Sequence, residues 1–335
     1  MLKKVKPLVI TSLVLSTMIT PSYASREIDI MGLTRVGPTP DELDYYWKSY
    51  QTDAYMTKDF YGLSLIDPAS PEAFEIFYSD NCYDSGNLSY TAMEDTLHLI
   101  NTMRFMAGVD EVNLDRDKNI LAQDAAYISY LNNSLSHYPQ RPAQMRSAEI
   151  YQSAYMGASS SNLSGGYYPL LRQVVSQMRD SSGQNYRDLG HRRWLLNPYV
   201  SSFGLGATEG SGAIHVVDPE AYYHSEVIAF PSMATYSQMF GKNTPWSLQV
   251  GKDFGKMSKN IRVEVKDLDT NKIRVYKKGQ GLIIDEEWYG DTSVLIFGRK
   301  LDTSPGKTYQ VKVKGLRLNG KSYPVSYGVV FHSCR

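Results

Sequence analysis

The chain has 335 residues, of which 42% are hydrophobic and 21% are charged, and these values are ordinary for globular proteins. Lys and Arg together number 35, as do Asp and Glu, so the formal net charge at pH 7 is zero. This balance excludes the strong overall positive field of many nucleic-acid-binding proteins, and we expect no nucleic-acid partner. At roughly 100–200 residues per domain, the length predicts about two domains.

The first 24 residues have the layout of a secretory signal peptide. Lysines at positions 3, 4 and 6 precede the largely apolar run LVITSLVLSTMIT, and Ser22 and Ala24 occupy the small-residue positions of a cleavage site. We therefore expect cleavage after Ala24 and a secreted, extracellular protein. The apolar run is shorter than the roughly 20 residues of a membrane-spanning helix. No later run reaches that length, so we expect no transmembrane span in the mature chain.

Cys82 and Cys334 are the two cysteines of the chain. Their spacing excludes a Cys-rich metal knuckle and a C-x-x-C redox pair. In an oxidising compartment they are candidates for a disulfide between the region before the main domain and the last strand. Two unpaired thiols are the alternative.

Residues 25–90 are interpreted as a helical N-terminal extension, with helices predicted over 41–56 and 70–80. In 91–108 and 117–137 the apolar residues recur at helical spacing, which predicts two amphipathic helices. A strand is predicted over 147–156, a helix over 169–181, and short strands over 201–208, 212–218 and 225–230. Helices that flank a few strands without regular βαβ alternation favour an α+β domain over 91–235.

The pattern changes at about residue 245, after a joint over 240–246. Short alternating runs follow, separated by Gly, Asn, Asp or Pro. Runs of this kind at roughly 8–12-residue spacing predict an all-β sandwich domain over 245–335. The predicted strands lie within 260–268, 272–278, 281–288, 293–301, 308–316 and 323–331.

Four motifs follow one another in the middle block. Asn101 and Arg104 have N-x-x-R spacing, SLSH ends at His137, SSSNLSGG comes next, and GHRRWLLNPYVSSFGLGAT is the last. In this order they resemble the CAP superfamily (cysteine-rich secretory, antigen-five and pathogenesis-related, or SCP-like, proteins) in a bacterial secreted form. SSSNLSGG stands where the family has G-E-N, and the last motif resembles G-H-R-x-N-I-L-N-P…G-x-G. The resemblance implies a CAP-like α-β-α sandwich, followed here by an immunoglobulin-like or fibronectin-like β-sandwich.

The resemblance also implies a cleft with two histidines and two acidic residues. Matched residue by residue, His137 and His191 take the places of the histidines, and Ser161 takes the place of the first Glu, next to the retained Asn162. Asp180 takes the place of the second acid. The chain therefore keeps both imidazoles, shortens one acid and loses the other. These five residues form the candidate ligand site, with His137 and His191 as candidate metal ligands.

The missing carboxylate bears on the predicted function. A stable zinc site uses three or four protein ligands, and general acid–base catalysis needs a positioned base with an orienting partner. We therefore expect no required cofactor, with a divalent metal such as zinc in the cleft as an option. The resemblance implies lipids, sterols or cell-envelope components as ligands.

These considerations favour a secreted binding protein with no catalysis or weak catalysis over an enzyme. The alternative is a zinc-dependent hydrolase that acts on peptide or cell-wall substrates through the His137/His191 cleft. The sequence leaves the ligand, the oligomeric state and attachment to the envelope open.

Several motif residues also have a purely structural interpretation. His137, at the predicted end of a helix, favours the negative end of the helix dipole. Arg192 and Arg193 are expected to be solvated or paired with Asp180 or Asp188. The Trp-Leu-Leu that follows is expected in the core, and the subsequent Asn-Pro in a turn.

Overall fold

The structure is a computed structural model that describes residues 38–49, 85, 88, 90–166, 170–208, 210–218, 221, 226–290 and 293–333. Across these residues the protein is mixed α+β, as predicted. The predicted signal peptide, the predicted helix over 70–80, Cys82 and Cys334 lie outside the described residues. In the described ranges, no helix combines the length and the apolar character needed to span a bilayer.

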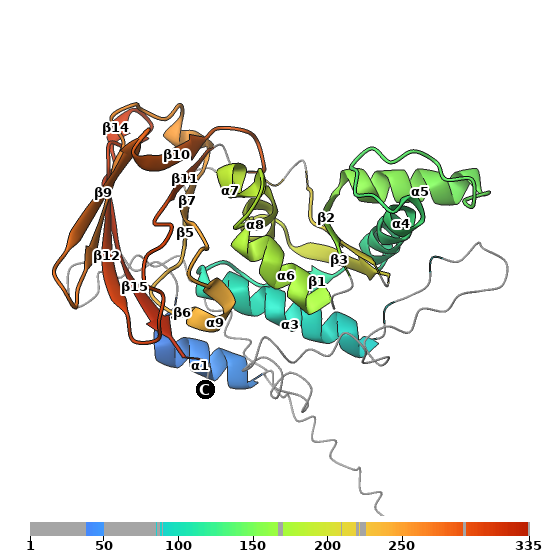
Figure 1. Cartoon of the computed structure of the whole chain (residues 1–335), viewed down its shortest axis with the longest axis horizontal. Helices are drawn as coiled ribbons and strands as arrows, with labels where there is room; N and C mark the ends of the chain where they lie inside the picture. The colour runs from blue at the N-terminus through green and yellow to red at the C-terminus, as the bar shows by residue number, and fades with distance from the viewer. Residues whose placement is uncertain are drawn as a thin grey trace, which may run out of the picture.

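A four-stranded sheet lies between two groups of helices (Figure 1). Its strand order is β1-β3-β4-β2, in which β1 runs parallel to β3 and the other neighbours are antiparallel. Helices α4 and α5 cover one face, and α3 and α6 cover the other. The elements are α3 (Tyr90–Met106), β1 (Asn113–Leu114), α4 (Arg116–Asn132), α5 (Ala148–Ser159), β2 (Ser161–Gly165), α6 (Leu170–Arg179), α7 (Asn185–Asp188), α8 (Gly190–Leu195), β3 (Ser202–Ala207) and β4 (Ser211–His215).

The two glycines of the G-x-G motif allow α4 to lie directly on β3. A Cβ atom at Gly204 would overlap the backbone of Lys118, and one at Gly206 would overlap the backbone of Gln123. At this close approach the Gln123 amide donates to the carbonyl of Ala207 (2.9 Å) and accepts from its N–H (3.0 Å). The motif therefore marks a contact between the helix and the sheet.

Helix α4 is shorter than the sequence predicts. It ends at Asn132, because Asn133 adopts a left-handed conformation (φ 46°) and its N–H bonds back to the last turn. His137 lies in the loop that follows, so it does not lie at the end of this helix as predicted. It meets the C-terminal end of α5 instead, at the carbonyl of Ala158.

The segment 147–156, predicted as a strand, is the first part of helix α5. Ser147 caps this helix, and its side chain accepts from the N–H groups of Glu149 and Ile150. Ala154 and Ala158 are buried one helical turn apart. The N-cap and the small residues that let α5 pack on α4 favour the helix.

The second sheet has nine strands in the order β5-β7-β11-β10-β9-β8-β12-β15-β6, and it is strongly curled (Figure 1). All six predicted C-terminal strands are present. The immunoglobulin-like or fibronectin-like arrangement stays a prediction. The elements are β5 (Val227–Phe230), β6 (Thr235–Tyr236), α9 (Ser237–Phe240), β7 (Trp246–Val250), the 3-10 helix η2 (Lys252–Phe254), β8 (Arg262–Asp267), β9 (Ile273–Lys278), β10 (Gly281–Asp285), β11 (Ser293–Phe297), β12 (Thr308–Lys314), the hairpin β13 (Arg317–Leu318) and β14 (Lys321–Ser322), and β15 (Val325–His332).

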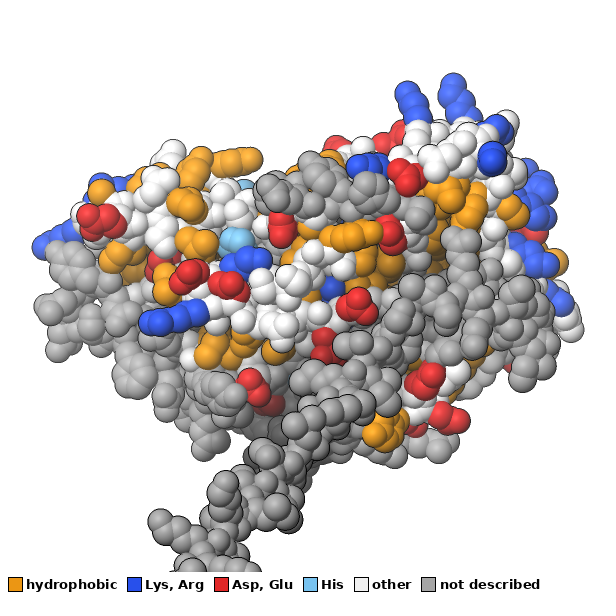
Figure 2. Space-filling view, turned by 180° about the vertical axis from the view of Figure 1, so that it is seen from behind, with side chains coloured by type: hydrophobic (Ala, Val, Ile, Leu, Met, Phe, Trp, Pro, Cys, Tyr) orange, Lys and Arg blue, Asp and Glu red, His pale blue; other side chains and the backbone are white. Residues whose placement is uncertain are grey.

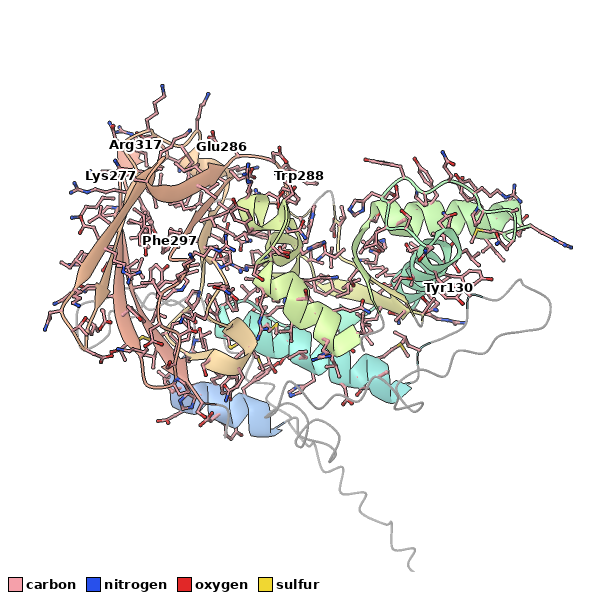
Figure 3. The ribbon with its side chains drawn as sticks, in the orientation of Figure 1. Tyr130, Lys277, Glu286, Trp288, Phe297 and Arg317 are labelled. Carbon is pink, nitrogen blue, oxygen red and sulfur yellow. The ribbon has the colours of Figure 1, made fainter. Side chains whose placement is uncertain are left out.

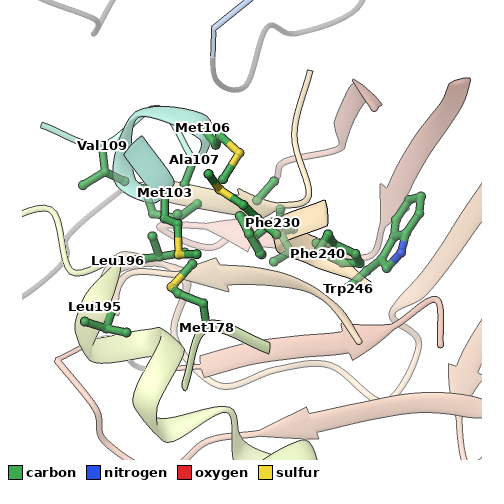
Figure 4. Packing of buried hydrophobic residues seen from close by; sticks show 14 of the residues in the cluster. Met103, Met106, Ala107, Val109, Met178, Leu195, Leu196, Phe230, Phe240 and Trp246 are labelled. Atoms are coloured by element: carbon green, nitrogen blue, oxygen red, sulfur yellow. The ribbon is translucent and has the colours of Figure 1, made fainter. Parts of the chain in front are cut away.

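One hydrophobic core runs through both halves of the molecule. Figure 4 shows Met103 of α3 and Met178 of α6 in the same cluster as Phe230, Phe240 and Trp246 of the C-terminal sheet region. Strand β5 is confirmed as a strand, but it pairs with β7 in the second sheet. The nine-stranded sheet thus begins at residue 227, inside the range 91–235 that the sequence assigns to the first unit.

The N-terminal helix α1 (Pro40–Ser49) also packs on this core. Leu43 is fully buried within it. Asp44 accepts hydrogen bonds from the hydroxyl of Tyr236 (3.0 Å) and the Nε2 of His332 (3.1 Å). The described part of the predicted helix over 41–56 is therefore confirmed and attached to the C-terminal sheet.

Candidate functional site

His191 lies at the start of α8 and is held by an acid that follows α6. Its Nδ1 is 2.8 Å from Oδ1 of Asp180, and the other oxygen of this carboxylate accepts from the backbone N–H of Arg192 (3.1 Å). Asp180 is buried, while 22% of the His191 side chain is exposed. Since a carboxylate accepts hydrogen bonds, Nδ1 of His191 is the donor and Nε2 is left for a ligand.

The charge of Asp180 sets the titration of His191. Burial lowers the pKa of His191, but the hydrogen bond and the charge of Asp180, helped by Asp188, outweigh it and raise the pKa above the ordinary value of 6.5. The His191–Asp180 pair therefore makes its full contribution to stability at pH values below the pKa that His191 has in the unfolded chain. This contribution is lost as the pH rises through the raised pKa of the folded state.

Replacing Asp180 with Asn is expected to lower the pKa of His191 below its value in the wild type. The amide keeps the size of the side chain and still accepts from Arg192, but the negative charge is gone. NMR titration of the imidazole Cε1–H measures the midpoint, with the other histidine resonances as internal controls. An unchanged midpoint for His191 would show that Asp180 does not set it.

His137 is held by a different layer of the fold. It is exposed, and its Nδ1 lies 2.8 Å from the carbonyl oxygen of Ala158 in the last turn of α5. A carbonyl only accepts, so Nδ1 again carries the proton and Nε2 has the lone pair. Both imidazoles thus have the same tautomer, oriented by a backbone carbonyl in one case and by a carboxylate in the other.

Strand β2 places its two site residues on opposite faces of the sheet, because successive side chains of a strand alternate. The amide of Asn162 donates to the carbonyl of His191 (3.0 Å) and so positions the start of α8. Ser161 is paired with His215 on the neighbouring strand β4. Both side chains lie on the face that packs against α4 and α5. Ser161 is only 2% exposed, and its hydroxyl has no hydrogen-bond partner within the described residues.

His215 joins the site although the sequence offers no spacing that identifies it. It is 7% exposed, and within the described part of the chain its Nδ1 has no hydrogen-bond partner. Burial, together with the charge of Lys118, lowers the pKa of His215 to about 4. The imidazole is therefore neutral at physiological pH. Only the pairing of β2 with β4 brings it to Ser161.

Arg192 is fully buried, so the expectation of a solvated side chain is wrong. Its guanidinium donates to the last carbonyls of α6, at Met178 (2.6 Å) and Arg179 (2.9 Å). It also reaches the carbonyl of Pro245 (2.8 Å) and the hydroxyl of Ser247 (2.9 Å) at β7. Arg192 thus joins the helices beside the candidate site to the second sheet.

Arg193 is also fully buried and connects α8 to the second sheet at another point. It pairs with the carboxylate of Asp285 (2.6 Å), and its guanidinium lies 4.4 Å from the ring centroid of Tyr289. The expected pairing with a carboxylate is therefore present, but the partner is Asp285, and the hydrogen bond to Asp188 goes to its backbone carbonyl (3.1 Å). Figure 3 shows Trp288, from the same connection after β10, close to α7 and α8.

The N-x-x-R pair of α3 is structural. The amide of Asn101 bonds in both directions to the backbone of Val112 (3.0 and 2.9 Å). Arg104 is buried and donates to the carbonyls of Leu195 (2.7 Å) and Asn197 (3.0 Å). These bonds fix the chain directly after α8. The Trp-Leu-Leu segment is buried and the Asn-Pro follows it in a turn, as predicted.

The chemistry of the two imidazoles suits a metal only in part. Histidines that bind metals typically donate their other ring N–H to a carboxylate or a backbone carbonyl, and His191 and His137 both do so. Asp180 is engaged by His191 and Arg192 and is buried. In the described ranges, no group of three or more His, Cys, Asp or Glu side chains is arranged to hold a metal ion.

Comparisons with protein-family models, with curated proteins and with solved structures found no match for this chain.

Proposed function

We propose that this protein is an exported, CAP-like binding protein whose ligand meets the imidazole edges of His137 and His191. The observation that carries the proposal is the exposure of the matched residues. Asp180 and Ser161 are 3% and 2% exposed, so Asp180 orients His191 and Ser161 fills space in the interior. The two imidazoles, in contrast, have solvent access. Two imidazoles with solvent access, one of them oriented by a buried acid, are suited to binding.

The motif order and the layers of the fold support the CAP-like part of this proposal. The sheet has helices on both faces, and the G-x-G and N-x-x-R motifs make contacts that hold the layers together. The CAP-like α-β-α sandwich and an immunoglobulin-like C-terminal sandwich are proposed as the finer description of the fold. Division into domains at 235–245 stays a prediction.

The class of ligand follows from the donors and acceptors that the imidazoles present. With Nδ1 protonated, Nε2 of each neutral histidine accepts a hydrogen bond, so the pair suits hydroxyl groups. The lipids, sterols and cell-envelope components that the CAP resemblance implies include molecules with such groups. Protonation of His191 converts its Nε2 to a donor, so binding of a hydroxylated ligand is expected to depend on pH.

The binding proposal is tested by isolating the protein from its native host and identifying co-purified small molecules by mass spectrometry. We expect a hydroxylated ligand with the wild type and at least a tenfold lower yield with the His137→Ala/His191→Ala double variant. Tyr199→Phe is the control, because Tyr199 is exposed and its hydroxyl donates to Glu226. Equal yields from all three proteins would contradict a ligand site at the imidazoles.

A zinc-dependent hydrolase is the second candidate function, and the tautomer that the two imidazoles share, with Nε2 unprotonated in each, favours it. Zinc bound at two Nε2 atoms would leave open positions for water or substrate. Calorimetry with Zn²⁺ alone and hydrolase profiling with peptide and cell-wall substrates separate the two candidates. Activity that is abolished both by a chelator and by His191→Ala, with the fold intact, would replace the binding proposal by this one.

A further inference from the structure

The chain is neutral overall because two regions of opposite net charge cancel each other. Residues 245–335 contain 17 Lys and Arg against 9 Asp and Glu, a net charge of +8, and the preceding residues contain 18 against 26, a net charge of −8. Figure 2 shows Lys and Arg side chains gathered along the side of the molecule that the C-terminal sheet forms. Positive charge is therefore concentrated on one part of the surface.

The strand register places much of this charge on one face of the sheet. In β8 and β12 the valines at positions 263, 265, 311 and 313 are buried, so the residues that alternate with them point outward. Directly opposite residues of paired strands share a face, and the pairing of β8 with β9 and β12 brings five cations and one carboxylate together. These six residues form the basic face: Arg262, Glu264, Lys266, Lys277, Lys312 and Lys314.

The single carboxylate of the basic face neutralises only part of its charge. Glu264 lies 3.0 Å from the ammonium of Lys314 and 3.4 Å from the guanidinium of Arg262. Lys266, Lys277 and Lys312 add three further cations on neighbouring strands, and Figure 3 shows Lys277 on the outer side of β9. The face therefore has a net charge of +4, which is complementary to a surface of anionic groups.

Two aliphatic side chains lie on the same face, on β9. Ile273 is 59% exposed and stands opposite Lys266, and Val275 is 48% exposed and stands opposite Glu264. A soluble polyanion makes no use of exposed aliphatic groups. A membrane interface does, because apolar side chains enter the boundary between headgroups and acyl chains while cations attract the anionic headgroups.

We infer that the basic face, with Ile273 and Val275, docks the protein on an anionic lipid bilayer. The cations contact lipid phosphates, and the aliphatic pair of β9 inserts at the level of the headgroups. This surface lies on a different sheet from His137 and His191, so the inference goes beyond the proposed cleft function and does not depend on it.

The test measures sedimentation with vesicles of phosphatidylcholine alone or mixed with phosphatidylglycerol. It uses the chain from Ser25 onward, which keeps every residue that the structure describes. We expect binding to the anionic vesicles and none to phosphatidylcholine alone. The Lys266→Gln/Lys277→Gln/Lys312→Gln variant is expected to lose on the order of 100-fold in affinity, and the Ile273→Ser/Val275→Ser variant on the order of 10-fold.

Arg116→Gln/Lys242→Gln/Lys300→Gln is the charge-matched control, since these cations are exposed and lie outside β8, β9 and β12. It is expected to retain most of the affinity, and circular dichroism verifies the fold of each variant. Equal losses in the two triple variants would overturn the inference. The inference would also be overturned if polyphosphate bound as tightly as the vesicles and the serine substitutions had no effect. Loss of vesicle binding in His137→Ala/His191→Ala would overturn it as well. Retained vesicle binding in that last variant separates this surface from the cleft.

Discussion

Replacing Arg192 with Ala is expected to lower the free energy of unfolding by about 4 kcal/mol, which is a large part of the roughly 5–15 kcal/mol of a typical domain. The guanidinium makes four hydrogen bonds while it is fully buried. Its removal leaves three carbonyls, two of them in buried contacts, and one hydroxyl without this donor and opens a cavity beside Phe230, whose ring centroid is 5.2 Å away. Unsatisfied buried polar groups and cavities are among the costliest changes in a core.

The planar arrangement of donors in the Arg192 guanidinium, and not its charge alone, explains why Lys is not an adequate replacement. Burial lowers the pKa of Arg192 to about 10, partly opposed by the charge of Asp180, so the guanidinium remains protonated at neutral pH. An ammonium group has only three donors on a single nitrogen and does not span acceptors on α6 and β7 at once. We therefore expect Arg192→Lys to be intermediate between the wild type and Arg192→Ala.

Urea denaturation followed by circular dichroism measures these effects. Arg187→Ala is the matched control, because Arg187 is exposed on the neighbouring helix α7 and its loss is expected to change the stability by no more than about 0.5 kcal/mol. If Arg192→Ala were as stable as Arg187→Ala, the bridge between α6 and β7 would not contribute to the fold.

Replacing Gly206 with Ala is expected to destabilise the protein by about 3 kcal/mol, at the upper end of the cost of overpacking a core. The added methyl group would overlap the backbone of Ala122 and Gln123 in α4. Backbone gives way less readily than the end of a flexible side chain, so the helix must move away from β3. This movement also breaks the two hydrogen bonds between Gln123 and Ala207.

Gly165→Ala in β2 is the control for Gly206→Ala, since it makes the same change of Gly to Ala at a site with room for the methyl group. A Cβ atom there meets only the side chain of Leu135, at 3.5 Å, which is an ordinary contact. The lower entropy of the unfolded chain then makes this variant neutral, or more stable by up to about 1 kcal/mol. Thermal melts of the two variants compare the sites, and equal melting temperatures would contradict the close approach of α4 to β3.

The local sequence pattern was sufficient to predict secondary structure wherever neighbouring residues along the chain decide it. Apolar residues at helical spacing predicted α3, α4 and α6, and alternation predicted the strands of the C-terminal sheet. The same reasoning was wrong for α5. There the capping by Ser147 and the packing of small residues on α4 decided the structure.

Of the candidate site, too, the sequence predicted one part and the tertiary structure decided the other. Matching to a family pattern selected His191 and Asp180, which form a hydrogen-bonded pair. It gave no indication that Ser161 faces His215, because that contact depends on the register between two strands far apart in the sequence.

The sequence by itself determined the class of the fold, most of its elements and the residues of the motifs. Tertiary structure decided the partners of those residues. Arg193 pairs with Asp285, 92 positions further along the chain, and β5 joins the second sheet. The physical reason is that periodicity and capping act over a few residues. A buried charge, in contrast, is satisfied by whichever polar groups the packed layers bring to it.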